Sequence, residues 1–145
     1  MPNKLNWNDT IPGTRNFTWG EVCTTSHDEK LLRKELLALP EDEFKSVCEN
    51  VISIAATLQL ARDFLGFPIP VENWYRSERV EKLVGGSGAN HKLGGAVDPK
   101  LSGDQLIHFV SFFAKGWGGG LGVGANQAHI DNGAGHPSGK RRWKY

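Results

Sequence analysis

The chain has 145 residues, of which 39% are hydrophobic and 23% are charged. This composition supports a folded core and argues against intrinsic disorder. Lysine and arginine total 17 against 16 aspartate and glutamate residues, and the resulting net charge of +1 gives no electrostatic footprint for duplex nucleic acid. No run of about 18 apolar residues could span a bilayer, and no signal-peptide pattern is visible. We expect one monomeric domain, residues 1–145, without nucleic-acid or membrane partners.

The first quarter of the chain predicts an arm followed by two short helices. Residues 1–16 mix Asn, Pro, Gly and Thr without periodicity, so we expect an extended N-terminal arm that Trp7 holds against the domain. Thr18 and Glu21 have the spacing of a capping box, which predicts the start of a helix. A leucine-rich segment follows and should form a second helix that ends before Pro40.

The strongest helix signal lies between Glu41 and Leu65. An acidic start suits the positive end of a helix dipole, and Gly66 followed by Pro68 predicts its end. We expect this to be the core helix, because its apolar residues recur at spacings of three and four. They are Phe44, Val47, Val51, Ile54, Ala55, Leu58, Ala61, Phe64 and Leu65.

The second half of the chain predicts short strands and two further helices. Residues 69–76 fit an extended segment, residues 78–84 a short helix, and residues 102–114 a helix with capping-box spacing at its start. Glycine dominates after Gly85, with short apolar islands at 96–97, 121–123 and 128–130. Helices first and strands later indicate an α+β domain with a small antiparallel sheet flanked by helices.

Two further features favour simple interpretations. Cys23 and Cys48 lack the CxxC spacing of a metal site, so we expect buried free thiols. The basic cluster at residues 140–144 could touch an anionic polymer, but a solvated tail is the favoured interpretation.

Two of the five histidines sit beside aspartates in glycine-rich segments: His91 to Asp98, and His129-Ile-Asp131. Catalytic zinc takes three protein ligands and leaves a fourth position for water, and His91, Asp98 and His129 would supply such a set. The glycines at 94–95 allow the chain to turn so that these side chains converge. Taken singly, each segment is more often a hydrogen-bonded pair or a solvated turn than a metal site, but the two together favour a metal site.

Short motifs from residue 16 to residue 143 occur in the same order as in a known family of peptidases. The sequence resembles the zinc D-alanyl-D-alanine carboxypeptidases and murein endopeptidases, a group related to the Hedgehog signalling domain and to lysostaphin-type enzymes. The resemblance covers residues 16–143, and its first four residues, Asn-Phe-Thr-Trp, are similar to the start of phage-encoded members. The matching segments are Tyr75-Arg76-Ser77, Val84-Gly85-Gly86, His91 with Gly94, Ala96 and Asp98, glycines 120–122, His129-Ile-Asp131-Asn-Gly133, and Arg142-Trp143.

The resemblance implies a Hedgehog/DD-peptidase-like fold with a zinc ion (Zn2+) bound by His91, Asp98 and His129. A water in the open position would attack a peptide carbonyl. Arg76 matches an arginine near the metal, suited to binding a substrate carboxylate or stabilising an oxyanion; the alternative is a structural salt bridge. The implied substrate is the peptide part of peptidoglycan. The implied setting is a phage lytic enzyme kept in the host cytoplasm until release, or associated with the virion.

The chain departs from the family pattern at two positions. Ala89 replaces a serine two residues before the first ligand, and Asn126 stands where relatives with an ExxH motif have glutamate. Asparagine cannot take a proton, so Asp131 becomes the leading candidate for the general base. The alternative is that Asp131 orients a ligand histidine. His136 could assist in acid-base work, although we favour solvent exposure.

Two other classes of function remain open. In a binding module, the same fold would hold zinc for stability or to grip cell-wall peptide, with catalysis lost at Asn126 and Ala89. In a structural protein of a particle, the metal residues would be relics. Trp117 could border the substrate groove or fill the core, and the core is favoured. Two other histidines, His27 and His108, are expected to be structural.

Overall fold

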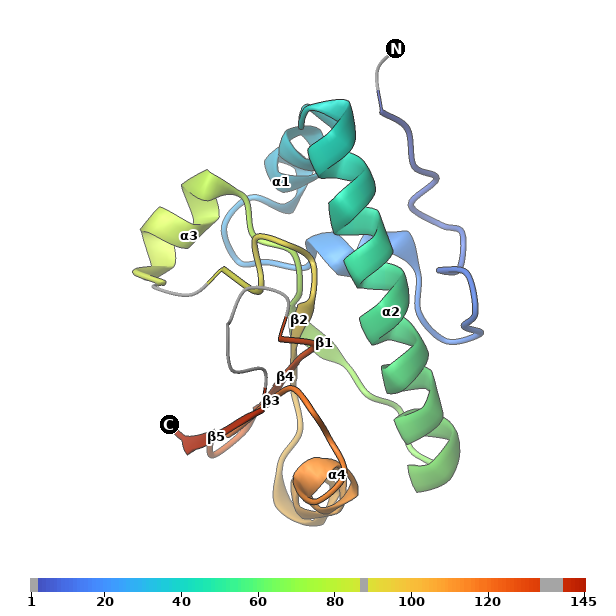
Figure 1. Ribbon diagram of the computed structural model, residues 1–145, viewed down its shortest axis with the longest axis vertical. Helices are drawn as coiled ribbons and strands as arrows, with labels where there is room; N and C mark the ends of the chain where they lie inside the picture. The colour runs from blue at the N-terminus through green and yellow to red at the C-terminus, as the bar shows by residue number, and fades with distance from the viewer. Residues whose placement is uncertain (1–2, 87–88, 134–139) are drawn as a thin grey trace.

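The computed structural model describes residues 3–86, 89–133 and 140–145. Its centre is a five-stranded sheet with the strand order β1-β2-β4-β3-β5 (Figure 1). Adjacent strands are antiparallel except β3 and β5, which are parallel. The predicted α+β class is therefore confirmed, with one parallel pair in a sheet expected to be antiparallel. The strands are β1 (Val71–Asn73), β2 (Ala96–Pro99), β3 (Gly120–Val123), β4 (Ala128–Asp131) and β5 (Arg141–Lys144).

The helices lie close to their predicted bounds. The 3-10 helix η1 (Trp19–Cys23) has the predicted capping box of Thr18 and Glu21. It is followed by α1 (Glu29–Leu37), α2 (Glu41–Leu65), α3 (Glu78–Val84) and α4 (Gly103–Ala114). Gly66 ends α2 with a φ of 77°, a left-handed conformation that glycine adopts without steric cost. Ser102 precedes α4, but its side chain does not make the predicted capping hydrogen bond.

The segment before η1 lies against the body of the protein. The side chain of Asn3 donates to the carbonyls of Leu37 and Leu39, at 2.9 and 2.7 Å. Ile11 is fully buried, and the ring of Trp7 lies under the guanidinium of Arg33. These contacts bring the start of the chain into the same core cluster as the strands.

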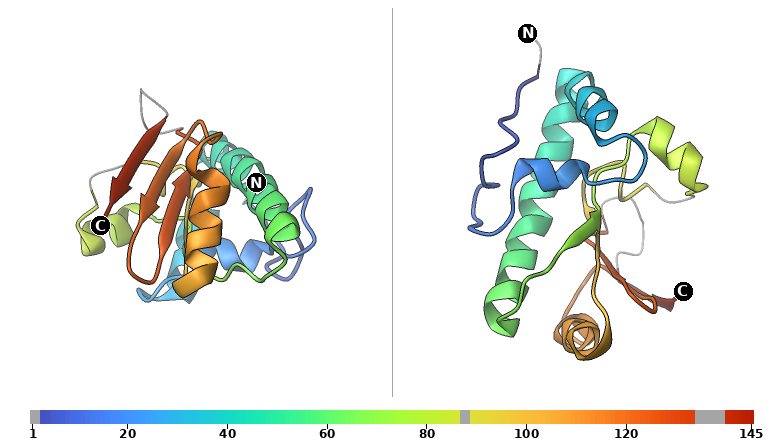
Figure 2. Two further views of the ribbon diagram at one scale, coloured as in Figure 1. Left: turned by 90° about the horizontal axis from the view of Figure 1, so that it is seen from below. Right: turned by 180° about the vertical axis from the view of Figure 1, so that it is seen from behind.

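Two helices cover one face of the sheet. α2 packs against β2 and α4, and α4 packs against β3. The left view of Figure 2 shows α4 between the strands and the long α2. Since successive side chains of a strand point to opposite faces, Val97 and Ile130 enter this core while Asp98 and His129 point the other way. The chemistry-bearing residues therefore share the face that α2 and α4 leave uncovered.

The C-terminal basic cluster was interpreted wrongly from the sequence. Instead of a solvated tail, Arg141–Lys144 form β5, which pairs with β3. Within this strand, Arg141 is only 23% exposed at its side chain because it meets the fully buried carboxylate of Asp131. Cross-strand pairing and a buried ionic partner are long-range effects, and both outweigh the local preference of a charge run for water.

Among the described helices, none combines the length and apolarity needed to cross a membrane. Both cysteines are free, as expected, and Cys23 is buried whereas Cys48 is half-buried.

Candidate metal centre

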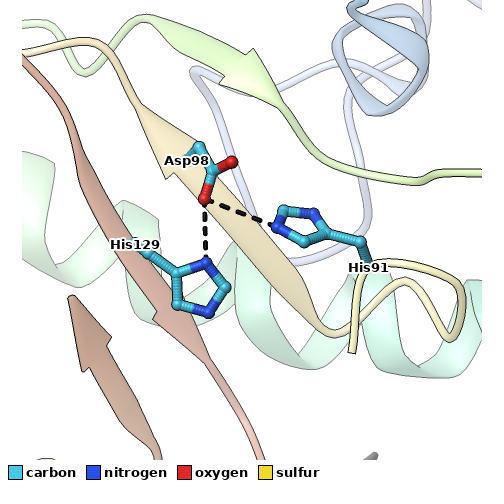
Figure 3. Close-up of side chains that lie close together, drawn as sticks. All are labelled: His91, Asp98 and His129. Carbon is cyan, nitrogen blue, oxygen red and sulfur yellow. Dashed lines mark hydrogen bonds and ion pairs between the residues drawn. The ribbon is translucent and has the colours of Figure 1, made fainter. Parts of the chain in front are cut away.

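The structure brings His91, Asp98 and His129 together. One ligand atom from each lies within 4.8 Å of the others, and all three residues are buried. They come from three places in the chain: the turn before β2, β2 itself and β4, with both imidazole rings directed at Asp98 (Figure 3). Oδ1 of Asp98 lies 2.8 Å from Nδ1 of His129 and 3.4 Å from Nε2 of His91. Two imidazoles and one carboxylate are a donor set that suits zinc and leaves a fourth position open.

A backbone carbonyl orients His91. Its Nδ1 lies 2.7 Å from the carbonyl oxygen of Trp74, so this nitrogen carries the proton and Nε2 is left free to ligate. Trp74 is itself fixed, because it is fully buried and its indole donates to the carbonyl of Gly94 at 3.1 Å. The histidine is thus held by a rigid part of the core.

A carboxylate orients His129. Oδ2 of Asp131 lies 2.7 Å from Nε2 of His129, on the side of the ring away from Asp98. Asp131 also accepts hydrogen bonds from Arg141 and from the backbone N–H groups of Gly120 and Gly133. Gly120 is required here, since a Cβ at this position would overlap Oδ2 of Asp131. The arrangement directs Nδ1 of His129 to the metal position.

Charges in the site are strongly coupled. Burial raises the pKa of Asp131, but hydrogen bonds from His129 and Arg141 outweigh it and lower the pKa to about 2. For Asp98, burial is likewise outweighed by hydrogen bonds from His129 and His91, so its pKa is also lowered. Burial lowers the pKa of His129, yet its bonds to Asp131 and Asp98 raise it overall. Both carboxylates are therefore ionised at neutral pH and available to a cation.

Gly94 makes the turn between the first two candidate ligands, His91 and Asp98, as the sequence predicted. Its φ is 79°, and a Cβ there would lie 2.8 Å from the carbonyl oxygen of Val47 and 3.0 Å from Cγ2 of Val51. Helix α2 thus packs directly on the turn that carries His91. No side chain larger than hydrogen fits without moving one of them.

We expect Gly94→Ala to lower the free energy of unfolding by about 3 kcal/mol, adding overpacking to the cost of a left-handed alanine. Gly13→Ala is the matched control, because Gly13 has a φ of 84° but no atom within 4 Å of its added Cβ. It should cost only about 1 kcal/mol. Urea denaturation of the metal-free proteins measures both. Equal losses would contradict the close packing of α2 on this turn.

Arg76 lies beside the three candidate ligands. Its NH2 is 3.5 Å from Oδ2 of Asp98 and its NH1 is 3.8 Å from Oε2 of Glu81, while its backbone N–H donates to the carbonyl of His91. These residues line a cleft of about 510 Å³. The cleft is also lined by residues of β1, of the β3–β4 connection, of β5 and of the residue after it: Asn73, Gln127, Arg141, Trp143 and Tyr145.

The wall formed by β5 is aromatic. The ring of Trp143 lies 5.0 Å from the ring of His129. It rests over Gly122, where any Cβ would collide with the indole. An aromatic wall next to a charged floor suits a ligand with both apolar and polar parts.

A comparison with protein families identifies the family to which the chain belongs. The model of the family described as Peptidase M15 matches residues 29–131, which is well over half of the chain and includes all three candidate ligands. This chain belongs to the peptidase M15 family. Membership implies a metallopeptidase, in agreement with the buried His-Asp-His cluster. No curated protein matches the chain in a sequence comparison.

Several other residues of this M15 peptidase were considered from the sequence. Asn126 is exposed in the β3–β4 turn, and Ala89 lies outside the set that lines the cleft. Trp117 packs on Phe113 and donates to the carbonyl of Gly120, in keeping with a core position. His136 falls at residues 134–139, outside the described residues.

The remaining histidines do not join the cluster. His108 is exposed on α4, and the backbone carbonyl of His27 accepts a hydrogen bond from Arg79.

Sequence reasoning missed Glu81, Arg141 and Tyr145, and it marked Trp143 only as part of the Arg142-Trp143 family motif. The charge run at residues 140–144 carried no signal for a strand, and Glu81 is one of two acidic residues in the short helix α3. Only their position in the folded peptidase marks them out.

Proposed function

We propose that this M15 peptidase is a zinc enzyme that hydrolyses an amide bond in the stem peptides or cross-links of peptidoglycan. The observation that carries the proposal is the buried His91, Asp98 and His129 cluster at the floor of a cleft. The nitrogen-rich donor set supports zinc over magnesium or calcium, which take oxygen ligands. A phage lytic role is part of the proposal, and its support is the similarity of residues 16–19 to phage-encoded members.

The three ligand residues would hold the ion, with Nε2 of His91 and Nδ1 of His129 as its nitrogen donors. Bound zinc supplies Lewis-acid activation of water and polarisation of the scissile carbonyl. Arg76 faces the same cleft and would bind a substrate carboxylate or stabilise the oxyanion that develops on the carbonyl. Its two ion pairs, at 3.5 and 3.8 Å, are long enough to leave hydrogen-bonding capacity for a ligand.

We propose that Asp131 acts as the positioning residue for His129, the second of the two roles considered from the sequence. Support comes from its hydrogen bonds, because both oxygens are engaged by Arg141 and one of them also by His129. A carboxylate with a pKa of about 2 is also a weak proton acceptor at neutral pH. Asp131 would keep the proton on Nε2 of His129.

The test is hydrolysis of purified peptidoglycan by the protein before and after metal removal. Zinc-loaded protein should release new amino groups; chelator-treated protein should not, and zinc but not magnesium should restore the release. The binding-module alternative gives a different result, in which the protein sediments with peptidoglycan and no amines appear. Full activity in the chelated protein would exclude a metal-dependent reaction.

A further inference from the structure

Buried polar atoms without partners gather around the metal cleft. Among the described residues, four buried side-chain atoms lack a hydrogen-bond partner: Nε of Arg33, Arg76 and Arg141, and Oε2 of Glu81. Three of these four residues line the cleft. Because an unsatisfied buried polar group destabilises a fold, this concentration indicates that a bound molecule completes their hydrogen bonds. The arginines need acceptors, and Glu81 needs a donor.

Of the carboxylates that line the cleft, Glu81 has the fewest ion pairs and hydrogen bonds to offset its buried charge. Its side chain is 10% exposed, and Oε1 lies against Gly86, where a Cβ would overlap it. The nearest cation is NH1 of Arg76 at 3.8 Å, and this guanidinium also faces Asp98 at 3.5 Å. Lys92, which follows the first ligand, is instead paired with Glu78 at 2.6 Å.

The contrast with Asp131 shows what Glu81 lacks. Asp131 is also buried, but Arg141, His129 and two backbone N–H groups satisfy both of its oxygens. Glu81 shares one arginine with Asp98, and the proposed function assigns Arg76 to a substrate carboxylate or oxyanion. A cation placed at the free Oε2 of Glu81 would compensate its buried charge more strongly than a neutral N–H.

We infer that Glu81 binds an ammonium group of the substrate, so that the peptidase selects peptides with a free amine close to the scissile amide. The inference rests on the proposed function and narrows its substrate class. Two sources of the ammonium fit the same chemistry: the α-amine of a peptide and the side-chain amine of a diamino acid in the stem.

The experiment uses the full zinc-loaded chain and three versions of one diamino-acid-containing stem peptide: unmodified, acetylated at the α-amine, and acetylated at the side-chain amine. kcat/KM is measured for each peptide with the wild type, Glu81→Gln and Glu78→Gln. Glu78→Gln is the matched control. It is the same substitution on the same helix, but the side chain of Glu78 is 63% exposed. Zinc content is measured for every variant.

In the wild type, acetylating one of the two amines should lower kcat/KM about tenfold or more, the range of a charge-assisted hydrogen bond. The amine whose acetylation lowers kcat/KM is the one that Glu81 binds. With the unmodified peptide, the kcat/KM of Glu81→Gln should be as low as that of the wild type with the sensitive amine acetylated. Acetylating that amine should cause no further loss in Glu81→Gln. Indifference of the wild type to both acetylations would overturn the inference, as would an equal loss by Glu81→Gln on all three peptides.

Failure of the proposed function is a separate outcome. If the zinc-loaded wild type cleaves none of the peptides, the same three are titrated into it by calorimetry. Tighter binding of the amine-bearing peptide, abolished in Glu81→Gln, would then uphold the ammonium site without the peptidase activity. Equal affinities would reject both.

Discussion

His129→Ala is expected to remove the bound metal and to lower peptidoglycan hydrolysis by about three orders of magnitude or more. The imidazole is one of the three proposed metal ligands, and its Nδ1 is 2.8 Å from Oδ1 of Asp98. Its loss leaves two candidate ligands and removes one hydrogen-bond partner from each of Asp98 and Asp131. Metal analysis should give about one zinc per wild-type chain and none in the variant, and the amine-release assay measures the activity.

The control for this variant is His108→Ala, the same substitution at an exposed position of α4. It should keep both the metal and the activity. Because His129 is buried, circular dichroism of the metal-free proteins establishes that the variant is folded. His91→Ala should reproduce the loss from a different segment of the chain. Zinc retained in folded His129→Ala protein would refute the assignment of the ligand set.

Asp131→Asn is expected to weaken zinc binding about 10- to 100-fold, the usual effect of removing the partner that orients a ligand histidine. The substitution preserves shape but replaces the carboxylate that accepts from Nε2 of His129 at 2.7 Å. It also leaves the half-buried guanidinium of Arg141 without its ion pair. Activity should therefore recover substantially when the zinc concentration exceeds the raised dissociation constant of the variant.

This recovery separates the two roles of Asp131. A general base would leave zinc affinity unchanged and lose kcat at saturating zinc, whereas a positioning residue loses affinity first. Competition with a chromophoric chelator measures the affinity, and Asp104→Asn, an exposed aspartate in the first turn of α4, is the control. Unaltered affinity with a collapsed kcat would return Asp131 to the role of base.

Local sequence signals account for the helices and for the three candidate metal ligands. The 3.6-residue periodicity, the acidic start and Gly66 define α2, and each of these acts within a few residues. His91, Asp98 and His129 stand in short motifs rich in glycine, so their identity is legible in the chain. Gly94 was likewise marked as the turn, although its contact with Val47 was not.

The tertiary structure alone decided how these residues are held. Pairing of β5 with β3 places Arg141 on Asp131 and Trp143 beside His129, although the basic run by itself favours solvent. Burial and shared charge single out Glu81 among the acidic residues of α3. The physical reason is range: capping, helix periodicity and turn geometry depend on neighbours in sequence. Strand pairing and the desolvation of charges depend on segments that meet only after folding.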